Sequence, residues 1–126
     1  MNDYWKKAID AAQDARILLA AGKANGAASR AYYAMYDAAR AALETVDLDL
    51  AKAKSHSAII SRFGNHIVVG QGLDPDLGRY LNTTEDLRIA ADYDRTGIPI
   101  ENARETVERM DKFLAAIAGL LGENPP

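Results

Sequence analysis

The chain has 126 residues, of which 48% are hydrophobic and 26% charged, a balance typical of one water-soluble globular domain. It contains no cysteine, which excludes disulfides and thiolate metal sites, and its two histidines argue against a histidine-based zinc site. The formal net charge of −3 argues against a protein that grips DNA at many phosphates without regard to sequence, although a local basic patch is compatible with it.

The N-terminal segment MNDYWKKAID has no apolar core and therefore does not resemble a signal peptide. No apolar run approaches the roughly 20 residues that a membrane-spanning helix needs. We therefore expect a cytoplasmic protein without a membrane partner, and no residue pattern calls for a metal or another cofactor.

Apolar residues recur at helical spacing in five segments, and strand patterns are nearly absent. The first two predicted helices span about residues 3–21 and 24–46. The third begins near Ser55, a suitable N-cap, and reaches Gly70. The fourth follows Asp74 as N-cap with Pro75 at its first position, and the fifth spans about residues 100–121.

The connections between these segments are short, apart from residues 47–54. Short links between long helices favour antiparallel neighbours, and alanine-rich helices allow their axes to approach closely. We therefore predict a single all-α domain over residues 1–126, an antiparallel up-and-down helical bundle of four main helices plus one shorter helix.

The second predicted helix carries a polar and aromatic stripe beside its apolar one. The stripe advances in steps of three and four residues: Arg30, Tyr33, Asp37, Arg40 and Glu44. One interpretation is a solvated face, on which each ion pair would contribute only about 0–1 kcal/mol. The other is a face turned toward a partner subunit or a nucleotide, because tyrosine and arginine are enriched in binding sites for both.

The position of each neighbouring aromatic residue relative to these stripes predicts whether it belongs to the core or to the surface. Tyr32 falls on the core side of its helix, where its hydroxyl needs one polar partner. Tyr33 and Tyr36 are the better candidates for a surface role. His56 lies on an apolar stripe near a helix N-terminus, which favours a structural histidine bonded to the backbone or to a tyrosine hydroxyl over a catalytic one.

Three segments resemble the HEPN domain family (higher eukaryote and prokaryote nucleotide-binding), and within it the small prokaryotic branch named UPF0332. They are SRAYYAMY with the following AARAAL (residues 29–43), KSHS with SRFG (residues 54–64) and LRIAADY (residues 87–93). The resemblance implies a helical bundle that commonly forms a homodimer. It also implies a ribonuclease or toxin paired with a minimal nucleotidyltransferase, or a non-catalytic member that binds nucleotide or RNA.

The chain departs from the catalytic pattern of that family, in which a histidine follows an arginine after four to six residues. No histidine follows Arg88, and His66 follows Arg62 after only three residues. Asp92 and Tyr93 stand close to where that histidine would be. Either would need a pKa shift of several units to act as the proton carrier that histidine is near neutral pH. The enzymatic status therefore stays open, with the missing motif arguing against catalysis.

Three hypotheses for function follow. The leading one is a catalytically degenerate HEPN module that binds nucleotide, RNA or a nucleotidyltransferase partner, in a toxin–antitoxin-type system. Its candidate surface comprises Arg30, Tyr33, Asp37, Arg88, Asp92 and Tyr93. The second is a metal-independent ribonuclease toxin with a divergent site, in which Arg88 acts with Tyr93 or His56. The third is a purely structural helical interaction domain, in which Arg88 and Asp92 form an ordinary intrahelical ion pair. The sequence leaves open the ligand, the partner, the dimer geometry and the direction of any toxin–antitoxin relation.

Overall fold

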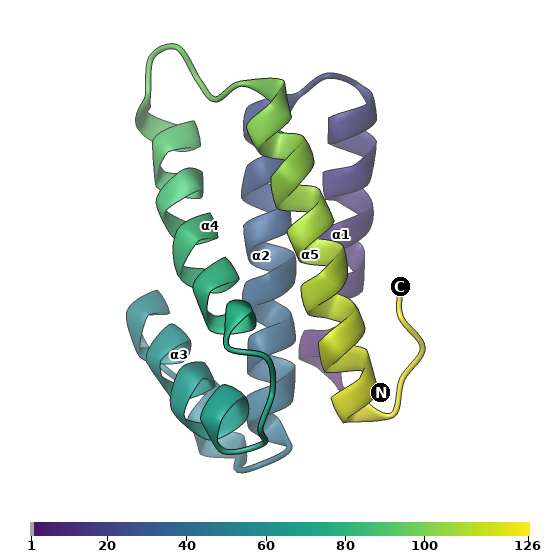
Figure 1. Ribbon diagram of the computed structural model, residues 1–126, viewed down its shortest axis with the longest axis vertical. Coiled ribbons are helices and arrows are strands. Elements are labelled where there is room, and N and C mark those ends of the chain that lie inside the picture. The colour runs from purple at the N-terminus through teal and green to yellow at the C-terminus, as the bar shows by residue number, and fades with distance from the viewer. Residues whose placement is uncertain (1) are drawn as a thin grey trace.

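The computed structural model describes residues 2–126, and these residues form helices joined by short loops (Figure 1). The α-helices are α1 (Asp3–Ala20), α2 (Ala24–Glu44), α3 (His56–Arg62), α4 (Asp76–Tyr93) and α5 (Ile100–Leu121). A 3-10 helix, η1 (Leu48–Ala51), lies in the longest predicted connection, and a π-helix, η2 (Phe63–Val69), continues α3. No strand occurs within residues 2–126, which confirms the predicted all-α class.

The long helices α1, α2, α4 and α5 lie side by side, and each runs opposite to the one before it (Figure 1). The shorter α3 and its continuation η2 pack against α2 and α4. The predicted up-and-down bundle of four main helices and one shorter helix is therefore confirmed. Within residues 2–126, no helix is long and apolar enough to cross a membrane.

The helices begin and end close to the expected residues because the capping side chains act locally. Ser55 Oγ accepts a hydrogen bond from the backbone N–H of Ala58 at 3.2 Å, as expected of the N-cap of α3. Helix α4 begins one residue later than predicted, at Asp76 with Pro75 as N-cap, and Asp74 Oδ1 accepts a hydrogen bond from the N–H of Asp76 at 2.9 Å. Gly122 ends α5 with φ +71°, a left-handed conformation that glycine adopts without steric cost.

The predicted end of α2 is wrong by two residues. Thr45 Oγ1 donates to the carbonyl of Ala42 at 2.6 Å, and the chain leaves the helix at Glu44. Val46, the last residue of the predicted helix, is 45% exposed. Its side chain therefore adds little to the core.

Helix α2 is the centre of the bundle, since it packs against α1, α4 and α5. From Ala27 to Leu43 every residue is buried except Ser29 and four members of the polar stripe, Arg30, Tyr33, Asp37 and Arg40, which are half-buried. The many alanines leave room for three neighbours at close range. The polar stripe is thus the one strip along which this central helix reaches the surface, and it is not a fully solvated face.

Candidate functional site

An aromatic and basic cluster forms where α2, α3 and α4 meet. Its members, here called the arginine–tyrosine cluster, are Arg30, Tyr32, Tyr33, Tyr36, His56 and Arg88. Four of the members, residues 30–36, come from about two turns of α2. His56 comes from the first position of α3, and Arg88 from the last third of α4.

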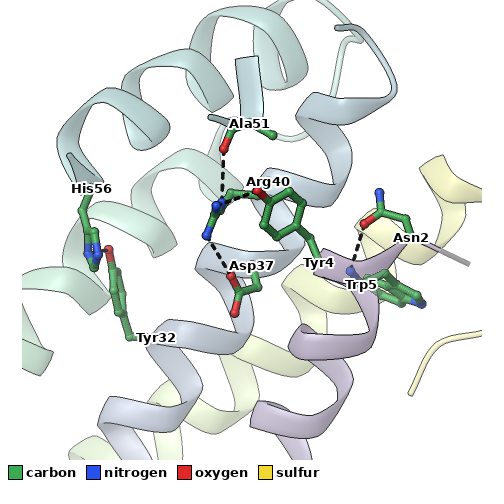
Figure 2. Close-up of polar contacts among 8 residues, drawn as sticks. All are labelled: Asn2, Tyr4, Trp5, Tyr32, Asp37, Arg40, Ala51 and His56. Carbon is green, nitrogen blue, oxygen red and sulfur yellow. Dashed lines mark hydrogen bonds and ion pairs between the residues drawn. The ribbon is translucent and has the colours of Figure 1, made fainter. Parts of the chain in front are cut away.

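The inner part of the cluster is a stack of three rings. The His56 ring lies 4.3 Å from the Tyr36 ring, centroid to centroid, at an interplanar angle of 29°. Tyr32 Oη and His56 Nδ1 share a hydrogen bond of 2.9 Å (Figure 2). This is one of the two contacts expected for His56, and it supplies the polar partner expected for the Tyr32 hydroxyl.

The depth of Tyr36 corrects one expectation from the sequence. Tyr36 is only 6% exposed, so its assignment to a surface role is wrong. It lies one turn beyond Tyr32 on α2, and α3 covers both rings through His56. The position of α3 depends on the tertiary fold and could not be read from the periodicity of α2.

In the outer part of the cluster, two guanidinium groups lie close to the Tyr33 ring. The Arg30 guanidinium carbon lies 5.6 Å from the Tyr33 ring centroid, and that of Arg88 lies 5.8 Å from it. Arg88 also lies 5.3 Å from the Tyr32 ring. Both cations are therefore held against aromatic rings, in the arrangement of cation–π contacts.

The two arginines have acidic partners but are not fully satisfied by them. Arg88 Nη1 lies 3.2 Å from Asp92 Oδ2, and Arg30 Nε lies 3.9 Å from Asp14 Oδ2, which is too long for a hydrogen bond. Within the described residues, the Nε atoms of both arginines are buried without a hydrogen-bond partner. An unpaired buried donor costs free energy, and the Arg30 side chain, which is 41% exposed, can still accept a ligand through its other guanidinium nitrogens.

Burial sets the protonation of the inner phenols. Desolvation raises the pKa of Tyr32 far above its ordinary value, and the nearby Glu85 carboxylate raises it further. Desolvation also raises the pKa of Tyr36, although Arg40 acts in the opposite direction. Both phenols therefore stay protonated near neutral pH and can donate hydrogen bonds, but neither is suited to accept a proton from a substrate.

Asp37 belongs to a neighbouring polar network around Arg40, which joins α1, α2 and η1 (Figure 2). Arg40 Nη1 lies 3.6 Å from Asp37 Oδ1, while Arg40 Nη2 donates to Tyr4 Oη at 2.7 Å and Arg40 Nε donates to the carbonyl of Ala51 at 3.2 Å. Burial raises the pKa of Asp37, and Arg40 partly offsets that rise. This arrangement favours a role for Asp37 in the fold, and its place in a binding surface stays a prediction.

The two candidates at the end of α4, Asp92 and Tyr93, differ in whether they reach the cluster. Asp92 pairs with Arg88, four residues before it, which is the ion pair expected from their spacing. Tyr93 is 81% exposed. Within residues 2–126, no aromatic or cation–π contact joins it to the arginine–tyrosine cluster. Of the six candidates, the fold therefore brings Arg30, Tyr33 and Arg88 together, with Asp92 attached through Arg88.

Two residues near the cluster were missed by the sequence argument. Asp14 approaches Arg30 from α1, and the charge of Glu85 on α4 acts on Tyr32. No local pattern links either one to the polar stripe, although Glu85 stands one turn before Arg88. In the described part of the chain, no three histidine, aspartate or glutamate side chains gather as metal ligands would.

The chain matches one family model and is similar to several named proteins. The model of the family described as "HEPN domain" matches residues 1–120. A UPF0332 protein of Gloeobacter violaceus is 40% identical over 91 residues, which is 72% of this chain and 70% of that protein. A UPF0332 protein of Thermotoga maritima is 27% identical over 94% of this chain and 89% of its own length.

A third relative carries a functional name. The Methanocaldococcus jannaschii protein named "Putative toxin MJ0142" is 34% identical over 109 residues, covering 78% of this chain and 70% of that protein. No solved structure gives a significant match to the chain.

Proposed function

Because the chain belongs to the HEPN family, in its UPF0332 branch, we propose that it is the HEPN component of a toxin–antitoxin-type pair and that its arginine–tyrosine cluster binds a phosphate of RNA or a nucleotide. The observation that carries this proposal is the convergence of two cations on one phenol: the guanidinium carbons of Arg30 and Arg88 lie 5.6 and 5.8 Å from the Tyr33 ring centroid. Guanidinium groups pair with phosphate, and a partly exposed phenol offers a face on which a base can stack.

The local charges limit the size of the ligand. Asp92 and Asp14 lie beside the two arginines, and the chain as a whole has a net charge of −3. Such a site lacks the dense positive field that holds a duplex along its length. We therefore expect contact with one or two phosphates of a single strand or of a nucleotide.

A binding assay with labelled single-stranded hexaribonucleotide tests this proposal. Arg88→Met keeps the aliphatic stem of the side chain and removes the charge, and it should weaken binding by roughly tenfold or more, because a hydrogen bond to a charged group contributes about 1.5–3 kcal/mol. It should also reduce the slope of log affinity against log salt concentration by about 1, the value expected for the loss of one phosphate contact. Far-UV circular dichroism of the variant controls for folding.

Arg104→Met on α5 is the matched control. It removes the same charge from an exposed arginine that pairs with Glu101 outside the cluster. Equal affinity of wild type, Arg88→Met and Arg104→Met would overturn the proposed site and favour a helical interaction domain in which Arg88 only supports the bundle. Equal weakening by both variants would mean that RNA affinity depends only on the net charge of the protein, which would also overturn the proposed site.

The same proposal includes protein partners. A toxin needs a neutralising partner, and a minimal nucleotidyltransferase is the partner that the family resemblance implies. Two of the three tyrosines on α2 are already buried within the chain, so a homodimer on this face would use Arg30, Tyr33 and the exposed part of α4. Growth arrest on expression of the chain, relieved by co-expression of a nucleotidyltransferase encoded beside it, would support the pairing. Expression without any effect on growth would count against a toxin.

A second candidate function, a metal-independent ribonuclease, is favoured by the proximity of His56 and Arg88. Both contact Tyr32: His56 through the 2.9 Å hydrogen bond and Arg88 over the ring. In such a reaction the ribose 2′-oxygen attacks phosphorus, the bond from phosphorus to the 5′-oxygen breaks, and a 2′,3′-cyclic phosphate forms. His56 would take the 2′-OH proton, a solvent water would protonate the leaving 5′-oxygen, and Arg88 would stabilise the charge on the phosphoryl oxygens.

An RNA-cleavage assay in the presence of EDTA tests this candidate. Wild type should release cyclic-phosphate products, and His56→Gln should lose that activity while it retains RNA binding. Intact RNA after incubation with wild-type protein would reject the ribonuclease and leave the binding proposal standing.

A further inference from the structure

A polar groove of about 400 Å³ lies between α4 and the continuous helix formed by α3 and η2. Its polar lining comprises Ser57, Ser61 and Asn65 on one wall and Asn82 and Glu85 on the other. The volume falls within the range of about 300–1,000 Å³ that is usual for small-molecule sites. Ser57, Ser61 and Asn65 are four residues apart, so they face the same way along their wall.

The groove adjoins the arginine–tyrosine cluster at two points. Ser57 directly follows His56, and Glu85 stands three residues before Arg88 on the same side of α4. The positions of Glu85 and Arg88 are therefore separated by about 4.5 Å along the helix axis. A ligand whose phosphate lies on Arg88 would extend into the groove with its next polar groups beside Glu85.

The donor set of the groove narrows the chemistry of that ligand. Serine hydroxyls and asparagine amides can both donate and accept, which suits the edges of a base. The ionised carboxylate of Glu85 can only accept, so it needs a donor from the ligand. In a ribonucleotide the donors nearest to the phosphate are the ribose hydroxyls, and the 2′-OH is the one that distinguishes RNA from DNA.

We propose that this groove holds the ribose and base of a ribonucleotide, and that Glu85 selects RNA over DNA by accepting a hydrogen bond from the ribose 2′-OH. The inference rests on the proposed function, because it assumes a phosphate at Arg88. It adds the class of sugar that the site requires and the residue that reads it.

The test compares three single-stranded hexamers of one sequence: RNA, DNA and 2′-fluoro RNA, which keeps an RNA-like sugar pucker but has no 2′ donor. Wild type should bind RNA roughly tenfold or more tightly than either analogue, since a hydrogen bond to a charged acceptor contributes about 1.5–3 kcal/mol. Glu85→Ala should bind all three with similar affinity. Glu108→Ala on α5 removes the same charge from another helix and should keep the wild-type preference for RNA.

The readout is the ratio of affinities rather than any single affinity. Glu85 also repels phosphate, so its loss is expected to strengthen binding of every oligonucleotide. A purely electrostatic role would change all three affinities by the same factor and leave the ratio of RNA affinity to analogue affinity unchanged. Equal binding of RNA and 2′-fluoro RNA by wild type, or an unchanged ratio in Glu85→Ala, would overturn the inference while the phosphate site stands. Failure of wild type to bind any hexamer would overturn the proposed function and this inference with it.

Discussion

Replacement of Arg40 by methionine tests whether the contact between Arg40 and Asp37 belongs to the fold or to a binding surface. Methionine keeps much of the aliphatic stem but removes the guanidinium group, whose carbon lies 4.0 Å from the Tyr4 ring centroid. It removes the hydrogen bonds to Tyr4 Oη and to the carbonyl of Ala51. It also leaves the Asp37 carboxylate, which is only 14% exposed, without its nearest cation.

The magnitude follows from these contacts. Each hydrogen bond to the charged guanidinium contributes about 1.5–3 kcal/mol, and removal of one partner of a buried ion pair costs about 3–5 kcal/mol. These terms overlap, and the freed side chain regains up to about 2 kcal/mol of conformational entropy. We expect Arg40→Met to lower the free energy of unfolding by about 3 kcal/mol, a large part of the roughly 5–15 kcal/mol of a typical domain.

Urea unfolding followed by far-UV circular dichroism measures this change. Arg104→Met is the control, because Arg104 and Glu101 are 50% and 70% exposed and an exposed pair contributes only about 0–1 kcal/mol. Asp37→Asn in the Arg40→Met background should recover part of the loss, since it removes the stranded carboxylate. A loss in Arg40→Met no greater than in Arg104→Met would refute the reasoning and leave Asp37 available to the candidate binding surface.

Two further predictions concern stability. Because burial raises the folded-state pKa of Asp37, its contribution to stability is fully present below its unfolded pKa and is lost as pH rises through the folded value. The difference in unfolding free energy between wild type and Asp37→Asn should therefore shift in favour of wild type as pH falls, and a pH-independent difference would contradict the raised pKa. Gly97→Ala should cost about 2 kcal/mol or more, against about 1 kcal/mol for Gly22→Ala, because both adopt left-handed φ but only the Cβ at Gly97 would come within 2.9 Å of the Asn25 amide. Equal midpoint temperatures of thermal unfolding for Gly97→Ala and Gly22→Ala would contradict the predicted clash.

The local features of the fold followed from the residues themselves. The cap of α3 and the end of α5 act through hydrogen bonds and backbone angles within a few residues, and for that reason their positions were predictable, whereas α4 begins one residue later than predicted. The end of α2 was missed because the Thr45 hydroxyl competes for a backbone carbonyl, whereas the prediction extended the helix to Val46.

The candidate site was only partly predictable, since it depends on contacts between helices far apart in the chain. Spacing alone placed Arg30 and Tyr33 on one strip of α2 and paired Arg88 with Asp92. The exposure of Tyr93 and the burial of Tyr36 required the positions of α3 and α4, which periodicity does not encode.

By itself, the sequence determined that this protein is an all-α bundle and which strip of α2 stays polar, because hydrophobic spacing and capping are properties of single helices. Only the tertiary structure decided that Arg88 would reach over Tyr32 and Tyr33, and that His56 would stack on Tyr36. The physical reason is that side chains on different helices meet through the packing of the whole bundle, and the rotation and height of each helix there depend on all its neighbours at once.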